Sequence, residues 1–280
     1  MSDQPEGLPP YFGAQGFSDS YWLELLCDKP PNPDIDALVE GVRAQMPIEV
    51  MVQSIDGGFG TVSLGYPDRP IKVGDIKMPA MTNLVWSGGR INLGDYKSAL
   101  DQTWEWDGAR KALGRCWYKM IVGDITGSRL PYKERLRRLT TLGVACVEQI
   151  KPLAVFWKEA GCLVEPDRLA ERMQRSCNVR TFNVGIAGDM LMDTIGLAAI
   201  GLPDVELLFS RLDPDAVAAF LYRTAEYLFE SGDIIKDGDT VPGPDGARWK
   251  TVHDVAAVAP PRTVVRVMVT GPNAPSTARS

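Results

Sequence analysis

The chain has 280 residues, of which 45% are hydrophobic and 24% charged, and its formal net charge is −6 at pH 7. These proportions are ordinary for a globular protein, and a chain of this length can bury a sufficient core without a disulfide or a metal ion. The acidic balance argues against general binding to nucleic acid or to an anionic membrane, and it leaves room for a basic protein partner.

The N-terminal residues 1–18 are polar and rich in glycine and proline, so we expect a flexible tail there. They lack the basic and apolar regions of a secretory signal, and no apolar run in the chain reaches the ~18 residues that a membrane helix needs. The five cysteines include no C-x-x-C pair. Together these features predict a cytoplasmic protein with reduced, mostly buried thiols.

The first part of the chain alternates between predicted strands and helices. Runs rich in apolar and β-branched residues, bounded by glycine or proline, predict strands at 21–27, 48–53, 59–66, 81–87 and 116–122. Apolar residues at helical spacing predict helices at 34–45, at 95–113 with a kink or division at Gly108, and at 131–150.

The second part continues in the same way. Strands are predicted at 153–157, 179–186, 190–197, 205–209, 249–252 and 263–269, and a short helix at 167–174. The clearest helix of the sequence runs from Pro214 to Ser231, because Asp213 is a good N-cap and Gly232 a natural stop.

This order of elements predicts an α+β fold with mixed, largely antiparallel sheets covered by helices. We expect residues 19–270 to form a single domain, which could divide into two sub-layers meeting near residues 88–115. The last segment, 271–280, is predicted to be a disordered tail.

The segment around the clearest helix carries a set of spaced residues that resembles a known signature. The matching residues are Met192-Asp193-Thr194, Gly196-Leu197, Gly201-Leu202-Pro203-Asp204, Leu212-Asp213-Pro214, Val217-Ala218, Leu221-Tyr222, Tyr227-Leu228-Phe229-Glu230, Gly232-Asp233 and Asp237-Gly238. They resemble the bacterial family catalogued as domain of unknown function 4261. The resemblance extends upstream through 130–135 to about Tyr21. It implies no established activity.

Histidine and glycine exclude several kinds of site. His253 is the only histidine, so a zinc site with several histidine ligands is impossible within one chain. A catalytic triad would need His253, but no G-x-S-x-G motif accompanies it, and we interpret it as an ordinary strand residue. The glycine runs do not match a phosphate-binding motif. We therefore assign no catalytic residue, no metal and no cofactor.

Carboxylates remain as the candidate functional groups. Between Asp189 and Asp245 the chain has twelve acidic and three basic residues, a difference of −9. We expect part of this acidic region to bind a partner, and the candidate residues are Asp193, Asp204, Glu206, Asp233, Asp237 and Asp239. The alternative is that these acids only cap helices, follow turns or solvate a surface.

Two functional hypotheses follow. The first is a protein-interaction module whose acidic surface attracts a basic partner, such as a toxin or effector domain. Within this class the resemblance suggests an immunity protein or an accessory protein of a bacterial secretion system. The second is an enzyme with a carboxylate-based or metal-assisted site near Asp193, Asp204 and the 233–239 loop. A structural or chaperone-like module cannot be separated from the first hypothesis by sequence.

Overall fold

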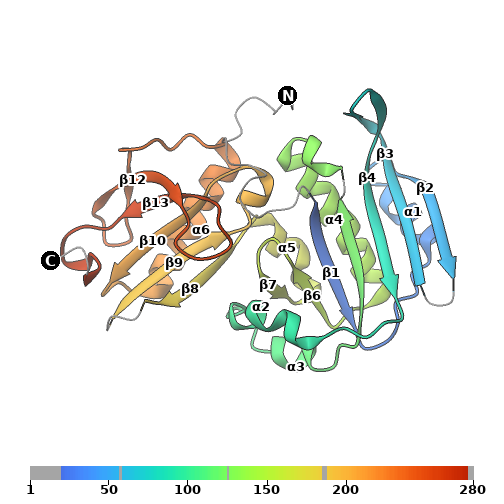
Figure 1. The fold of residues 1–280 in the computed structure, drawn as a ribbon, viewed down its shortest axis with the longest axis horizontal. Helices are drawn as coiled ribbons and strands as arrows, with labels where there is room; N and C mark the ends of the chain where they lie inside the picture. The colour runs from blue at the N-terminus through green and yellow to red at the C-terminus, as the bar shows by residue number, and fades with distance from the viewer. Residues whose placement is uncertain (1–19, 57–58, 125, 185–187, 277–280) are drawn as a thin grey trace. The chain divides into compact units, whose positions relative to one another are not determined.

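The computed structural model describes residues 20–56, 59–124, 126–184 and 188–276 (Figure 1). Its contacts divide the chain into two compact units between Gln174 and Arg175. We call the described residues up to Gln174 the N-terminal unit and those from Arg175 the C-terminal unit. We expected one domain with a possible division near 88–115, but all of that segment belongs to the N-terminal unit. The expected tail, 1–18, lies outside the described residues.

The N-terminal unit contains a seven-stranded antiparallel sheet in the order β2-β3-β4-β5-β1-β6-β7. The strands are β1 (Tyr21–Cys27), β2 (Glu49–Asp56), β3 (Phe59–Val73), β4 (Ile76–Ser87), β5 (Tyr118–Asp124), β6 (Ala154–Trp157) and β7 (Cys162–Val164). The strand predicted at 59–66 continues to Val73, across an irregularity in its pairing with β4 that begins after Tyr66.

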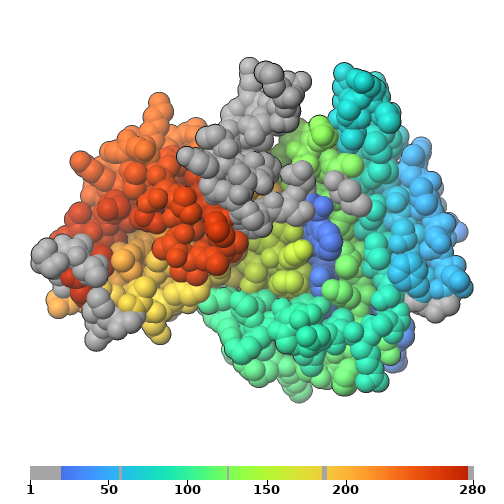
Figure 2. Space-filling model, viewed as in Figure 1, coloured from blue at the N-terminus to red at the C-terminus, as the bar shows by residue number. Residues whose placement is uncertain are grey.

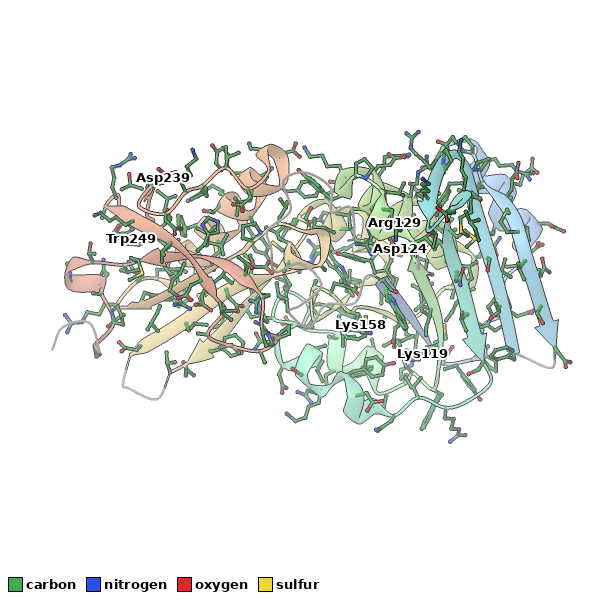
Figure 3. All side chains as sticks on the ribbon, turned by 45° about the horizontal axis from the view of Figure 1, so that its top comes forward. Lys119, Asp124, Arg129, Lys158, Asp239 and Trp249 are labelled. Carbon is green, nitrogen blue, oxygen red and sulfur yellow. The ribbon has the colours of Figure 1, made fainter. Side chains whose placement is uncertain are left out.

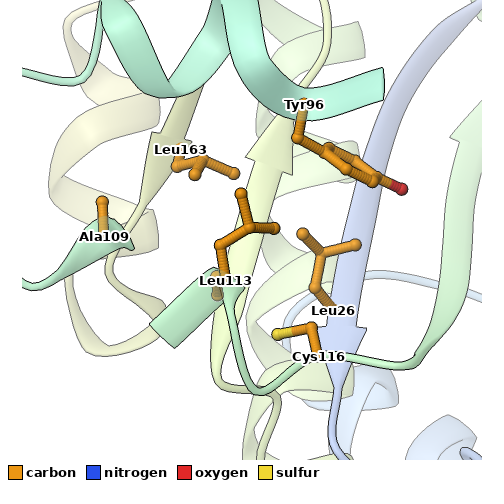
Figure 4. Packing of buried hydrophobic residues seen from close by; sticks show 7 residues of the cluster. Leu26, Tyr96, Ala109, Leu113, Cys116 and Leu163 are labelled. Carbon is orange, nitrogen blue, oxygen red and sulfur yellow. The ribbon is translucent and has the colours of Figure 1, made fainter. Parts of the chain in front are cut away.

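Helices cover both faces of this sheet at β1. Leu23 points to α4 (Tyr132–Ile150), where a Cβ added at Gly143 would lie 2.7 Å from its Cδ1. The helices α1 (Ile35–Arg43) and α5 (Leu169–Gln174) pack against α4. Leu26 lies on the other face, in a core with Tyr96, Leu113 and Leu163 (Figure 4). Because both faces are covered, β1 is buried almost throughout instead of alternating with polar residues.

The helix predicted at 95–113 is divided. The segment forms a 3₁₀ turn (Leu93–Tyr96), α2 (Lys97–Asp101) and α3 (Ala109–Leu113). The interruption has a structural cause, because the hydroxyl of Thr103 accepts a hydrogen bond of 2.8 Å from the backbone N–H of Leu163 on β7. Gly108 allows the close approach of Trp106, whose Nε1 would lie 2.8 Å from an added Cβ.

The C-terminal unit contains a six-stranded sheet in the order β11-β12-β13-β10-β9-β8. The strands are β8 (Asn178–Asn183), β9 (Asp189–Ile195), β10 (Asp204–Ser210), β11 (Thr240–Pro242), β12 (Arg248–Val255) and β13 (Thr263–Met268). Only β10 and β13 pair in parallel among these described strands. The helix α6 (Pro214–Ser231) packs on β8, β9 and β10. Both units thus confirm the α+β class with mixed, largely antiparallel sheets.

Short 3₁₀ turns complete the fold at Gly127–Arg129, Pro166–Arg168, Ala198–Ile200 and Gly271–Asn273. The last turn lies where we expected a disordered tail. Ala274 is buried, and the backbone N–H of Ser276 donates to the Asp189 carboxylate at 2.9 Å. Residues 277–280 lie outside the described residues. Among the helices that the structure describes, none is long and apolar enough to cross a membrane.

Candidate functional site

A row of charged side chains crosses four strands of the C-terminal sheet. Asp193 on β9 lies directly opposite Arg180 on β8 and opposite Glu206 on β10. Glu206 in turn lies opposite Arg266 on β13. Residues that face each other across neighbouring strands share one side of the sheet, so the register alone brings these four side chains together.

Arg262 joins this row to Asp204. Its Nη2 lies 2.6 Å from Asp193 Oδ2, and its Nε lies 3.1 Å from Asp204 Oδ2. All three side chains are fully buried. Arg180 gives Asp193 a second guanidinium, with Nη2 at 2.6 Å from Oδ2. Burial alone would lower the pKa of Arg262, but Asp204 and Asp193 raise it, so Arg262 stays charged.

Asp204 also fixes the turn between β9 and β10. Its carboxylate accepts hydrogen bonds from the Thr194 hydroxyl at 2.9 Å and from the backbone N–H groups of Leu197 and Ala198. Burial raises the pKa of Asp204, and Arg262 and Thr194 act in the opposite direction. Gly201 has φ +88°, which favours glycine. The Gly201–Asp204 segment therefore has a structural reason for its sequence.

Three of the six candidate acids consequently do not lie on a surface. Asp193 and Asp204 are 0% exposed and Glu206 is 1% exposed. Glu206 binds Arg266 at 2.8 Å and accepts a hydrogen bond of 2.7 Å from the backbone N–H of Ala257. From these positions the three carboxylates cannot reach a partner's surface. Their charge is balanced inside the unit, as a buried carboxylate requires.

The other three acids, Asp233, Asp237 and Asp239, lie in the loop that follows α6. Gly232, with φ +82°, ends the helix, and the loop then binds back to β12. The hydroxyl of Thr251 donates to the Lys236 carbonyl at 3.0 Å, and the N–H of Gly238 donates to the Thr251 carbonyl at 2.8 Å. These contacts hold the loop along the strand.

His253 on β12 lies between two of these acids. Its Nδ1 is 2.9 Å from Asp237 Oδ1 and its Nε2 is 3.1 Å from Asp233 Oδ1. Burial lowers the pKa of His253, but the hydrogen bonds to Asp237 and Asp233 outweigh it and raise the pKa above its ordinary value. Hydrogen bonds from His253 lower the pKa of Asp237. The sequence placed His253 on a strand but did not predict this pairing, because the residues are 16 and 20 positions apart.

A groove of about 640 Å³ opens beside this loop. Its apolar lining includes Phe220 and Tyr227 of α6, Ile234 and Ile235 of the loop, and Val241 of β11. Tyr227 is 50% exposed and Ile234 is 47% exposed, whereas Phe220 packs edge-on against the buried Trp249. The groove thus has a packed floor and an exposed apolar rim.

Charges of both signs line the same groove, namely those of Arg223, Arg248 and Asp239. Figure 3 labels Asp239 and Trp249 on neighbouring elements of the C-terminal unit. Asp239 accepts a hydrogen bond from the backbone N–H of Lys236 at 2.9 Å, and Arg248 binds the Thr240 hydroxyl at 2.7 Å. Because the walls are tied by these contacts and by the β11–β12 ladder, the groove is formed before any ligand binds.

Within the part of the chain that the structure describes, no three histidine, cysteine or acidic side chains are grouped so that they could hold a metal ion. All five cysteines are buried and none forms a disulfide bond, whereas the sequence predicted mostly buried thiols.

The comparison with protein families matches residues 193–268 to the family described as Domain of unknown function (DUF4261). The resemblance is therefore confirmed over the segment that begins at Asp193 and includes the loop, most of the buried charges and the groove. The matched segment does not include 130–135 or the rest of the N-terminal unit. Neither the comparison with curated proteins nor that with solved structures gave a match.

Proposed function

We propose that this chain is a protein-interaction module that binds a partner through the groove of the C-terminal unit. The observation that carries the proposal is the groove itself, where exposed Tyr227 and Ile234 border a packed apolar floor. Aromatic and aliphatic side chains at a concave site, surrounded by charged groups, are the usual composition of an interface centre. An apolar side chain of the partner would fill the groove.

The charges that remain exposed define the chemistry of the partner. Asp237 and Asp239 stay exposed in the loop, and Glu226 and Glu230 are exposed on α6. Of these acids only Asp239 lines the groove, so the exposed acids of the loop and of α6 favour a basic surface on the partner mainly outside it. Arg223 and Arg248 line the groove and favour an acidic group of the partner within it. The narrower assignment, an immunity protein that neutralises a basic toxin or an accessory protein of a bacterial secretion system, rests on the family resemblance and is part of the proposal.

The enzyme hypothesis is weaker because its central residues are already engaged. Asp193 and Asp204 are buried and paired with Arg262, and Asp204 also accepts two backbone N–H groups. A general acid or base must reach the proton that it transfers. These two carboxylates instead support the register of the sheet and the turn before β10.

The test is a quantitative pull-down with the tagged full chain from the organism that produces it. The groove variant is Tyr227→Ser with Ile234→Ser, and the matched control is Val255→Ser with Met268→Ser, which are 49% and 47% exposed in the same unit and do not line the groove. We expect one stoichiometric protein with the wild-type chain and the control, and its loss with the groove variant. A partner that binds all three chains equally would contradict the proposal, and so would a chain without any partner.

The captured partner then allows a test of its charge. Raising the ionic strength should slow association, because salt screens the attraction between the exposed acids and a basic surface. Asp237→Asn with Asp239→Asn should reduce that salt dependence. An association rate that does not change with salt would contradict a basic partner surface, but it would not contradict binding in the groove.

A further inference from the structure

The two sheets have four edge strands, and one of them differs from the other three. In the described part of the chain β7 has three residues, all buried, and β11 has three residues and ends in Pro242. The first three of the six residues of β8 are buried. The fourth edge, β2, has eight residues, every one of them exposed. Proteins usually prevent further strand pairing with short edge strands, proline, coverage, bulges or charges along the edge. β2 is long, uncovered and without proline, its irregularity is confined to Val50–Val52, and its two acids stand only at its ends.

The side chains of β2 are unusually apolar for an exposed strand. Val50, Met51, Val52 and Ile55 are between 39% and 57% exposed. No lysine or arginine lies within the strand. The light-blue atoms of the segment around β2 lie at the right-hand margin of the N-terminal unit in Figure 2. Neighbouring apolar groups exposed on one edge indicate an interaction surface.

The backbone of β2 is regular enough to pair with another strand. A single irregularity lies between Val50 and Val52, and from Val52 to Asp56 each residue pairs in order with β3. A strand pairs through backbone groups on both of its sides, so this regular run presents unpaired N–H and C=O groups outward.

We propose that β2 accepts an extended strand of a partner protein that is apolar in its middle and basic at both ends. The carboxylates of Glu49 and Asp56 stand at the two ends of β2, and among the described residues neither carboxylate has a cation within 4 Å. An added antiparallel strand with lysine or arginine at its ends would pair with both acids, while its apolar residues would cover Val52 and Ile55.

Charge also argues against a second copy of this chain as the occupant. Two β2 strands paired antiparallel over their full length would place Glu49 of one opposite Asp56 of the other at both ends. Like charges directly opposite each other destabilise a strand pair. The same acids therefore disfavour self-association and favour a basic strand.

The proposal is tested with two capped synthetic peptides and the full chain. Both peptides carry valine or isoleucine at every position between their ends, and they differ only in lysine or glutamate at the two ends. Amide hydrogen exchange and a binding titration are measured for the wild type and for Glu49→Lys with Asp56→Lys. Because both side chains are exposed, the thermal unfolding of the variant should match the wild type.

We expect the lysine-ended peptide to slow exchange in residues 49–56 of the wild type and to bind about tenfold more tightly than the glutamate-ended peptide. The charge-reversed variant should show the opposite preference. Equal affinity for both peptides, or protection elsewhere than in β2, would overturn the proposal. A wild-type dimer through β2 would overturn it in favour of a second copy. Because β2 lies in the N-terminal unit, these outcomes do not depend on the groove.

Discussion

At the scale of single residues, Arg262 connects the buried charges of the C-terminal unit. One guanidinium contacts Asp193 and Asp204 and also donates to the carbonyl of Thr194 at 2.8 Å. A buried ion pair adds little stability compared with apolar packing, but the removal of one partner leaves a buried charge uncompensated. The burial of Asp193 and Asp204 as charged groups therefore depends on Arg262.

Arg262→Met should destabilise the chain by about 3–5 kcal/mol, because Asp204 loses its cation inside the sheet. The control is Arg248→Met, whose guanidinium is exposed and binds Thr240, and which should change stability by only about 0.5 kcal/mol. Urea unfolding of both variants gives the comparison. Similar losses in the two variants would show that Arg262 does not hold the network.

His253 should make stability depend on pH. The folded state raises the pKa of His253, so its contribution is fully present below the unfolded pKa and is lost as the pH rises through the folded pKa. The folded state lowers the pKa of Asp237, so that contribution is present above its unfolded pKa and is lost as the pH falls through the folded pKa. Both contributions are therefore present between the unfolded pKa of Asp237 and the unfolded pKa of His253, and the pair is most stabilising at about pH 5.5.

His253→Gln tests this pair by thermal unfolding at several pH values. The melting temperature of the wild type should exceed that of the variant most at about pH 5.5, and the difference should shrink as the pH rises through the folded pKa of His253. Lys250→Gln, an exposed neighbour on the same strand, is the control. A difference that grows with rising pH would mean that His253 is stabilising as the neutral ring.

At the scale of elements, α4 shows how one glycine determines helix packing. Gly143 lies in the middle of α4, and an added Cβ would come within 2.7 Å of Leu23 Cδ1 on β1. Gly41 lies in α1 with no atom within 4 Å of an added Cβ. Two helical glycines thus have opposite surroundings.

Gly41→Ala should stabilise the protein by about 1 kcal/mol, since alanine is the better helix former. Gly143→Ala should lose that gain and destabilise the N-terminal unit by about 1–3 kcal/mol, because the contact with Leu23 forces the helix or the side chain to shift. The measurement is the unfolding free energy of each variant. Equal stabilisation by both substitutions would show that the core around Leu23 accommodates the added methyl group without a loss of free energy of unfolding.

Elements with strong local signals could be predicted from the sequence, and the others could not. The helix α6 begins and ends where Asp213, Pro214 and Gly232 predict it. The helix predicted at 95–113 is divided before Ala109, where a kink or division at Gly108 was expected. Its first part already ends at Asp101, which the sequence did not predict, because Thr103 contacts β7, 60 residues away. The strand β7 itself has three residues, too few for a periodic pattern.

At the scale of the whole molecule, each unit has its own sheet, and the described sheets share no strand. The N-terminal core contains Leu26 and the C-terminal core contains Leu221, both of which are 0% exposed. Units with separate cores can lose stability separately.

Leu26→Ala should lower the hydrogen-exchange protection of β1 and β5 by an amount that corresponds to about 2–5 kcal/mol and leave β10 and β13 unchanged. Leu221→Ala, the matched change in the other core, should do the reverse. Protection lost in both units from either substitution would show that they unfold as one.

The sequence indicates one part of the candidate site, whereas the other parts depend on contacts between distant segments of the chain. The acidic loop follows directly from the sequence, and Asp233, Asp237 and Asp239 lie there. The burial of Asp193, Asp204 and Glu206 depends on the register of four strands and on Arg262, which follows Asp204 by 58 residues. The groove likewise joins α6, the loop and β11, so no single segment of the sequence indicates it.

The most direct test of the interaction proposal is site-specific photo-crosslinking in living cells. A benzophenone side chain is placed at Tyr227, on the rim of the groove, and in a second chain at Met268, which is similarly exposed on β13. We predict one crosslinked protein at stoichiometric yield from position 227 and none from position 268. The same products from both positions, or none from 227, would contradict a partner that binds in the groove.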